Sequence, residues 1–292
     1  MRITEGINYQ TLLQDIARAQ ERVQTAQNQV SSGKKVTAPS DNPTAAADIV
    51  RLTGENSEAE QYSRNLTFAK SKLQVTDDVI DGVEKMVERV RTLGQLSFGN
   101  PTAASAYIAE VSGLRDQIIS AANTMHAGRF LFAGSATTTA PYLKNPDSSV
   151  TYLGNAEGMS LQVTRSAALP TQLPGSEVFS GSVNIFTVMT DLTTAMQSGN
   201  KAGIDTQVRK LGQFADTVSV ARSKVGSYLN LAANIESELS SAKLARETEL
   251  SKEQAADLAT AISELTLSQQ GLQATLAVGA RISQLNILDY LK

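Results

Sequence analysis

The residues that could do chemistry in this chain are few and widely separated. His126 is the only histidine among 292 residues, and cysteine is absent. A zinc site built on several histidines or on thiolates is therefore excluded, and a Ser-His-Asp triad has a single candidate for its base. Because His126 lies near the end of a predicted helix, and helix C-termini favour such side chains, we expect it to cap that helix or to be solvated. The missing cysteines leave the redox compartment open.

Two short strings mimic signatures of penicillin-recognising serine enzymes. Residues 31–34 fit S-x-x-K and residues 40–42 spell S-D-N, but the third signature, K-T-G, is absent. The two strings also flank a single turn, which leaves no room for an intervening helical domain. The Gly33-Lys34 pair lacks the upstream glycine of a phosphate-binding loop and is more simply the end of a helix. We therefore expect no catalytic, cofactor-binding or metal-binding residues, and no enzyme.

Charge and hydropathy argue against two classes of partner. The chain carries 26 Lys and Arg against 29 Asp and Glu, without a basic stripe, so nucleic-acid binding is not expected. The first ten residues contain no apolar core of a secretory signal, which predicts that no signal peptide is cleaved. Residues 265–280 are uncharged but rich in Gln, Ser and Thr, whereas a spanning helix needs about 20 mainly apolar residues. No membrane contact is expected.

Both ends of the chain are predicted to be amphipathic helices without enough partner surface nearby. Apolar residues recur at helical spacing over residues 9–30 and again over 258–288, and the sixteen residues between Glu264 and Arg281 carry no charge. Isolated helices of this kind are marginal in water. We expect them to become buried against each other and against other copies of the chain. The predicted subunit-interface residues are Leu12, Ile16, Val23, Val30, Leu265, Leu272, Leu276, Ile282, Leu285 and Leu288.

The region between the ends is predicted to be helical with a small β-rich insertion. Asn42 and Pro43 suit the N-cap and first position of a long helix with one apolar seam, which breaks at the Gly-Asn-Pro of 99–101. A third helix follows. Residues 137–181 then hold four of the seven prolines and short β-type runs at 150–153 and 161–163, before helical spacing resumes.

These patterns predict a mainly α protein, an elongated antiparallel helical bundle with both termini at one end and a small β-rich domain inserted at the other. The seams of the two long inner helices are expected to form the core of one monomer, whereas the ends depend on assembly. The predicted domains are an inner assembly domain of terminal helices (1–35 and 256–292), a helical bundle domain (36–136 and 182–255) and the small β-rich insertion (137–181).

Six strings, spread in order along nearly the whole chain, form a distinctive set. They are SSGKK at 31–35 with PSDNP at 39–43, GRFLFAGS at 128–135, VGSYLN at 225–230, LAVGARI at 276–282 and LNILDYL at 285–291. The set resembles that of the flagellin-like axial proteins of the bacterial flagellum, whose signature SSGK...PSDDP differs here by Asn42. GRFLFAGS and the C-terminal strings look like those of the junction proteins of that family. The motif residues are Ser31, Ser32, Gly33, Lys34, Pro39, Ser40, Asp41, Pro43, Gly128, Arg129, Phe130, Phe132 and Gly134.

The resemblance implies a structural protein that is exported unfolded through the flagellar type III apparatus, without a cleaved signal. It would be extracellular, at the hook-filament junction of the flagellum. Its implied partners are hook-associated protein 1, flagellin, copies of itself and an export chaperone in the cytoplasm. Members of the family have disordered ends in the monomer that form a paired-helix inner tube after assembly.

Three alternatives stay open at this point. A short flagellin would form the filament itself. A coiled-coil secretion adaptor would have ordered terminal helices in the free monomer. An enzyme carried on a flagellin scaffold would need its active site in the insertion, which has no histidine and only Asp147, Glu157 and Glu177 as carboxylates.

Overall fold

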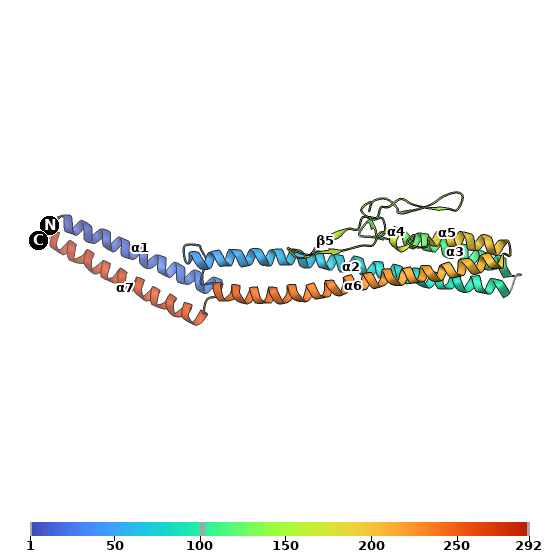
Figure 1. The fold of residues 1–292 in the computed structure, drawn as a ribbon. Helices are drawn as coiled ribbons and strands as arrows, with labels where there is room; N and C mark the ends of the chain where they lie inside the picture. The colour runs from blue at the N-terminus through green and yellow to red at the C-terminus, as the bar shows by residue number, and fades with distance from the viewer. Residues whose placement is uncertain (1, 100–102, 291–292) are drawn as a thin grey trace. The chain divides into compact units, whose positions relative to one another are not determined.

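The computed structural model describes the backbone of residues 2–99 and 103–290 and the side chains of residues 10–98 and 103–281. Two compact units are formed: residues 1–58 with 241–292, here called the terminal unit, and residues 59–240, here called the central unit. Helices dominate the described residues, so the predicted mainly α class is confirmed (Figure 1). The helices are α1 (Arg2–Ser32), α2 (Pro43–Gly99), α3 (Ala104–Ala122), α4 (Gly175–Val178), α5 (Ile185–Gln197), α6 (Lys201–Gln254) and α7 (Leu258–Tyr290).

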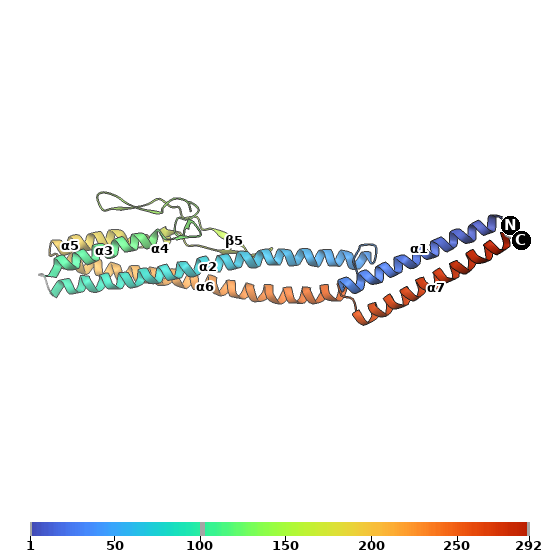
Figure 2. The ribbon, with the colours of Figure 1, turned by 180° about the vertical axis from the view of Figure 1, so that it is seen from behind.

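In the terminal unit, α1 and α7 lie side by side and run antiparallel, with their outer ends together (Figures 1 and 2). The predicted helix boundaries on the N-terminal side are confirmed. Gly33 follows α1 with φ 67°, the left-handed conformation of a helix C-cap. Asn42 Oδ1 accepts a hydrogen bond from Ala45 N–H (3.1 Å), and Pro43 is the first residue of α2. The three-part domain division stays a prediction.

The long apolar seam of α2 is confirmed as core of the monomer. It faces α6, whose buried residues Leu211, Val218 and Val225 follow the same helical spacing. In the central unit α3 packs on α5, which adds a second layer of helices. Tyr62 in the α2 seam is only half-buried. The seam residues with at most 6% exposure are Leu52, Ala59, Leu66, Ala69, Leu73, Thr76, Ile80, Val83, Val87 and Val90.

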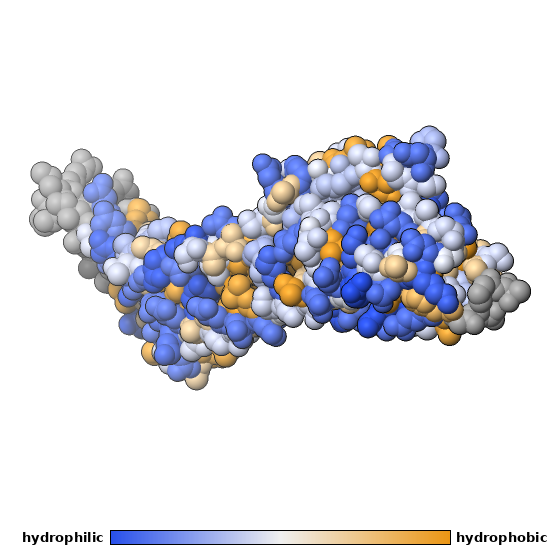
Figure 3. Space-filling model, turned by 45° about the vertical axis from the view of Figure 1, so that its right-hand side comes forward, coloured by the Kyte–Doolittle hydropathy of each residue, from blue (hydrophilic) through white to orange (hydrophobic). Residues whose placement is uncertain are grey.

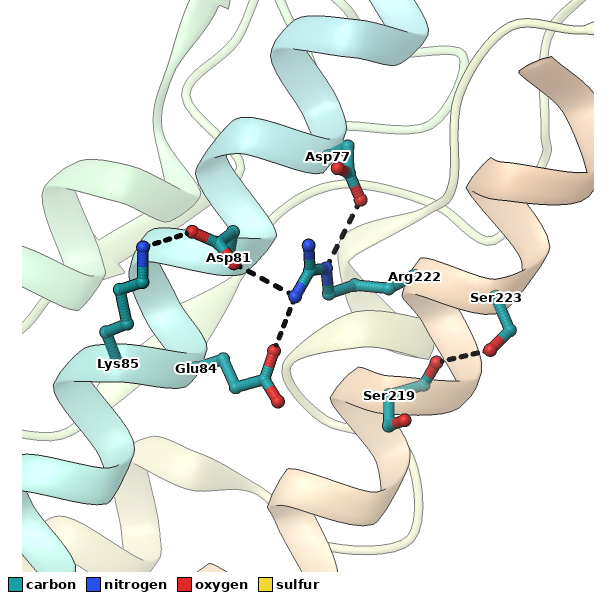
Figure 4. Close-up of polar contacts among 7 residues, drawn as sticks. All are labelled: Asp77, Asp81, Glu84, Lys85, Ser219, Arg222 and Ser223. Carbon is teal, nitrogen blue, oxygen red and sulfur yellow. Dashed lines mark hydrogen bonds and ion pairs between the residues drawn. The ribbon is translucent and has the colours of Figure 1, made fainter.

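An ion-pair network joins α2 to α6 in the central unit (Figure 4). Arg222 Nε lies 3.3 Å from Asp77 Oδ1, and its Nη1 lies 2.9 Å from Asp81 Oδ1 and from Glu84 Oε2. Spacings of three and four residues place these carboxylates on one face of α2. A hydrogen bond from Lys85 to Asp81 lowers the pKa of this aspartate. Because all of these side chains are about a third exposed or more, we expect the network to fix the register of the two helices more than to raise stability.

Among the described residues of the central unit, three two-stranded antiparallel sheets form the β region. The strands predicted near 150–153 and 161–163 are confirmed as β4 and β5, and Asn65 Nδ2 of α2 donates a hydrogen bond to Gln162 O (2.8 Å). The other strands, of two or three residues each, were not predicted. The pairs are β1 (Met125–His126) with β2 (Arg129–Phe130), β3 (Tyr142–Lys144) with β4 (Val150–Tyr152), and β5 (Ser160–Gln162) with β6 (Ala168–Pro170).

His126 lies in strand β1, so the expected role as a helix cap was wrong. Helix α3 already ends at Ala122, and Asn123 takes the capping position, with its N–H bonded to Ile119 O (3.1 Å). The imidazole is half-buried, and its ring centroid lies 6.0 Å from that of Phe68. The short turn between α3 and β1 therefore places His126 beside Phe68 of α2, and the side chain is not fully solvated.

A buried lysine links the β region to α2. Lys72 is 5% exposed, and its Nζ donates a hydrogen bond to Gln172 Oε1 (2.6 Å). Gln172 Nε2 donates in turn to Gly134 O. Burial lowers the pKa of Lys72 from 10.5 to about 8, and the positive charge of Arg129 adds to this effect. The charged form of Lys72 is thus disfavoured in the folded protein.

This depressed pKa predicts that stability rises with pH in the alkaline range. Below about pH 8 Lys72 is protonated in the folded and the unfolded chain, whereas between pH 8 and 10.5 only the unfolded chain keeps the proton. Chemical denaturation of wild type and Lys72→Met at several pH values isolates this group. Over that range, the unfolding free energy of wild type should increase by up to about 3 kcal/mol relative to that of Lys72→Met. A pH-independent difference would contradict the assignment.

Candidate assembly interface

Small residues let α1 and α7 approach each other closely. Ala19 and Ala26 of α1 are 3% and 5% exposed, and Ala261 of α7 is 4% exposed. Further along α7, a Cβ atom on Gly279 would lie 3.2 Å from Leu12 Cδ2, so a larger residue there would have to displace this leucine. The two helices of one chain therefore bury a narrow stripe against each other.

Most of the predicted interface residues lie beside this stripe, inside one chain. Helical spacing places them on the same faces as the buried alanines, and a pair of helices can bury them only in part. The half-buried residues are Leu12, Ile16, Val23, Val30, Leu265 and Leu272. Leu276 differs, since it is 48% exposed. Ile282, Leu285 and Leu288 lie outside the residues whose side chains are described. Contact of any of these residues with a second copy stays a prediction.

Helix α7 exposes apolar side chains on both sides of its contact with α1. At about 100° per residue, Leu258, Ile262 and Leu276 fall on one flank, and Leu267 and Val278 fall on the other. These five side chains are between 48% and 67% exposed. Leu267 and Val278 were not among the predicted interface residues, because the prediction followed a single seam. Their signal was the absence of charge on every side of residues 265–280. Exposed apolar surface of this kind marks interaction sites.

An open groove of about 820 Å³ between α1 and α7 is lined mainly by charged and polar residues of both signs. Two guanidinium groups and three carboxylates line it, and Arg18 Nη1 lies 3.6 Å from Asp15 Oδ1 with both side chains more than half exposed. Such a surface suits salt-dependent contacts with polar side chains. The lining residues are Asp15, Arg18, Glu21, Arg22, Thr25, Ala26, Gln29, Glu264, Leu267 and Ser268.

Neither a metal-ligand cluster nor a membrane-spanning helix occurs in the described ranges 2–99 and 103–290. Within them no cluster of histidine, cysteine, aspartate or glutamate is placed to hold a metal ion. The helices as described also lack an apolar stretch long enough to cross a membrane. On the face drawn in Figure 3, hydrophobic atoms form scattered patches in a largely hydrophilic surface.

The SSGKK and PSDNP strings build the connection from α1 to α2. Ser31 and Ser32 donate their hydroxyl hydrogen bonds to Asn28 O (3.1 and 2.6 Å) in the last turn of α1. The Asp41 carboxylate accepts hydrogen bonds from the N–H groups of Ala38 and Thr37 (both 2.9 Å), which lower its pKa. Each side chain thus closes a local turn, and the motif has a conformational role within the chain. Pro39 and Ser40 are exposed in this turn.

The GRFLFAGS string forms a hairpin and then enters the core. Ala127 and Gly128 both have positive φ, 49° and 75°, as a two-residue type I′ turn between β1 and β2 requires. Phe132 is fully buried, with its ring centroid 5.1 Å from that of Phe179. Gly134 has φ 65°, and a Cβ atom there would overlap Asn155. These glycines are therefore required by the backbone.

The N-terminal half of the chain matches a known family. A family model described as the bacterial flagellin N-terminal helical region covers residues 3–137. This part of the chain is therefore similar to the N-terminal helical region of bacterial flagellins. The matched residues include α1, α2 and α3, the connection at residues 33–42 and the β1–β2 hairpin.

Relatives extend this similarity to nearly the full chain. Flagellar hook-associated protein 3 of Escherichia coli (strain K12) is 26% identical over 306 residues, covering 94% of this chain and 95% of that protein. Flagellin FljK of Caulobacter vibrioides is 25% identical over 215 residues, covering 70% and 77%. The crystal structure of flagellar hook-associated protein 3 from Legionella pneumophila covers 70% of this chain and 98% of that chain with a TM-score of 0.64. At 13% identity, this last match supports the fold alone.

Proposed function

We propose that this chain is a structural axial protein of the bacterial flagellum that joins the hook, through hook-associated protein 1, to the flagellin filament. The observation that carries the proposal is the similarity to hook-associated protein 3 of Escherichia coli, which spans 94% of this chain and 95% of that protein. Similarity to a flagellin covers only 70% of this chain. The role is structural and not catalytic.

We further propose an export route and a set of partners for this chain. The chain leaves the cell through the flagellar type III apparatus without a cleaved signal, with an export chaperone in the cytoplasm. It then acts outside the cell, where copies of itself, hook-associated protein 1 and flagellin are its neighbours. The exposed apolar flanks of α7 support contacts of this kind, because apolar side chains that stay exposed to water do not stabilise the free chain.

Assembly buries what the pair of terminal helices leaves exposed. Within a copy, α1 and α7 meet through the alanine stripe, and the flanks of α7 pack on neighbouring copies. Contacts between unlike surfaces, repeated by a screw operation, give an open helical lattice. Ordering of the ends costs conformational entropy, and burial of the flanks offsets that cost only in the assembly.

The ordering step predicts different protease sensitivity in the two states. In the free monomer, brief proteolysis should remove residues 1–30 and 258–292 while the middle of the chain survives. In assembled particles both ends should resist the same treatment, because backbone buried in an interface is inaccessible to a protease. Mass spectrometry of the fragments reads the cleavage sites. Equal protection of both ends in the monomer would contradict the ordering step and favour a coiled-coil secretion adaptor.

The rival within the family is a short flagellin, which the similarity to flagellin FljK favours. Seeding purified chain with filament fragments separates the two functions. A junction protein should add a short, limited segment to the seeds, whereas a flagellin should elongate them into long fibres from this chain alone. Growth of long fibres would overturn the junction proposal and leave the similarity to flagellin-like proteins intact.

A further inference from the structure

Backbone hydrogen bonds join the segment that follows α1 to the segment that precedes α7. Lys34, just after α1, pairs with Ala255, just before α7, as an isolated antiparallel β-bridge. The N–H of Lys35 donates to Gln254 O (2.7 Å), and the N–H of Ala256 donates to Gly33 O (2.9 Å). Two segments far apart in sequence are thus joined just after the end of α1 and just before the start of α7. We call these two hydrogen bonds, with the Lys34 and Ala255 pair, the bridge.

Side chains reinforce the bridge on the N-terminal strand. Lys35 Nζ donates to Lys252 O (2.6 Å), 217 residues away in sequence, in the last turn of α6. This places a cation on the carbonyl end of a helix, where the backbone dipoles favour positive charge. Gln29 Nε2, in the last turns of α1, donates to Lys35 O (3.4 Å). Lys35, next to the bridged pair, is therefore also bonded to α1 through Gln29 and to α6 through Lys252.

Each connection is closed by its own cap, so no helix runs through the bridge. Gly33 ends α1 with a left-handed residue. On the other strand, Asp257 Oδ1 accepts a hydrogen bond from Ala259 N–H (3.0 Å), which starts α7 as a new helix. Order in α1 or α7 is consequently not required for order in α2 or α6.

The bridge is also where unwinding from the chain ends first meets non-local backbone bonds. A helix frays by breaking local hydrogen bonds one after another. Between α1 and α7 the described contacts are side-chain contacts through a narrow stripe, whereas the bridge joins two distant strands directly. Beyond it, Val36, Ala45 and Leu52 are 8%, 4% and 1% exposed, which gives the adjoining turns a buried core.

We propose that the bridge is a latch that stays closed in the free chain and marks the limit of assembly-dependent order. This inference rests on the proposed function, in which both terminal helices order on assembly. The closed latch holds the end of α1 close to the start of α7, which raises the effective concentration of the two helices for pairing. Both helices therefore order together when a neighbouring copy binds.

Disulfide trapping in the free, full-length chain tests the latch, and the chain offers a clean background because it has no cysteine. Lys34 and Ala255 form a non-hydrogen-bonded antiparallel pair, whose Cα atoms lie about 4.5 Å apart in such pairs. That separation is within the range of a disulfide. The test variant is K34C/A255C, at two exposed positions. The control variant is L12C/G279C, which probes the contact of α1 with α7.

In the free chain, K34C/A255C should oxidise at least about tenfold faster than L12C/G279C, because a disulfide forms from the closed population. In assembled particles both pairs should close. Slow closure of K34C/A255C in the free chain would overturn the latch. Fast closure of both pairs would mean that the ends are ordered in the monomer, which overturns the ordering step of the proposed function and with it the boundary assigned to the latch.

A second pair of variants tests the boundary without cysteines. Lys35→Pro and Lys35→Ala both lose the side-chain bond to Lys252, but only the proline removes the N–H that donates to Gln254. Proteolysis of free Lys35→Ala should stop where it stops in wild type, near residues 35 and 255. In Lys35→Pro it should continue into the first turns of α2 and the last turns of α6. Identical cleavage sites in the two variants would overturn the latch.

Discussion

Replacing Leu276 with aspartate is expected to abolish assembly while leaving the helix content of the free chain nearly unchanged. The side chain is 48% exposed on a flank of α7, so a carboxylate there remains in water in the monomer. In the proposed assembly the same flank is buried, and an unpaired buried charge costs several kcal/mol. Every copy pays this cost, so the loss repeats along the lattice. Circular dichroism reports the helix content, and sedimentation of particles grown on hook fragments reports assembly.

Two controls separate the effect of the flank from that of the substitution. Leu276→Met keeps an apolar side chain of similar volume and should assemble nearly as wild type. Gln270→Asp places the same charge on the exposed back of α7, away from both flanks, and should impair assembly far less. Normal assembly of Leu276→Asp, or equal loss in Gln270→Asp, would contradict the assignment of this flank to a contact between copies.

Phe132→Ala is expected to cause the largest loss of stability in the central unit, about 3–5 kcal/mol. Its ring is fully buried and meets Phe179 edge to face, at a centroid distance of 5.1 Å. Phe179 in turn contacts Tyr142 at 5.4 Å, so the substitution opens a cavity in a connected aromatic cluster. Urea denaturation followed by circular dichroism measures the unfolding free energy.

Phe68→Ala is the matched control for this prediction. Phe68 is 45% exposed on α2, and its neighbour is His126 at 6.0 Å, so truncation should cost about 1 kcal/mol or less. Equal losses in the two variants would show that Phe132 does not anchor the core. They would also remove the structural reason for an apolar residue at this position of GRFLFAGS.

The parts of this fold that depend on neighbouring residues were predictable from the sequence. The α2 seam follows helical spacing, and burial at Leu66 and Val90 confirms it. Gly33 and the Asn42-Pro43 pair define helix ends through their own backbone preferences, so the predicted end of α1 and start of α2 were correct. Interactions three or four residues apart are enough for such predictions.

Features that depend on distant residues were not predictable in this way. The pairing of Lys34 with Ala255 joins two segments that have no strand pattern of their own. Leu12 was predicted to lie at a subunit interface, and within the chain its side chain lies beside Gly279 of α7, while its contact with a second copy stays a prediction. A seam shows that a partner exists without showing which helix provides it. Leu267 was missed for the related reason that one helix has three apolar directions here.

The location of the chain on the organelle tests the central claim most directly. A copy carrying a small label in the β3–β4 turn, at residues 145–149, should restore flagella in cells that lack the unlabelled chain. The label can then be imaged on intact flagella. The proposed function predicts one labelled zone per flagellum, between the hook and the filament. Label distributed along the filament would contradict the junction role and assign the chain to the filament itself.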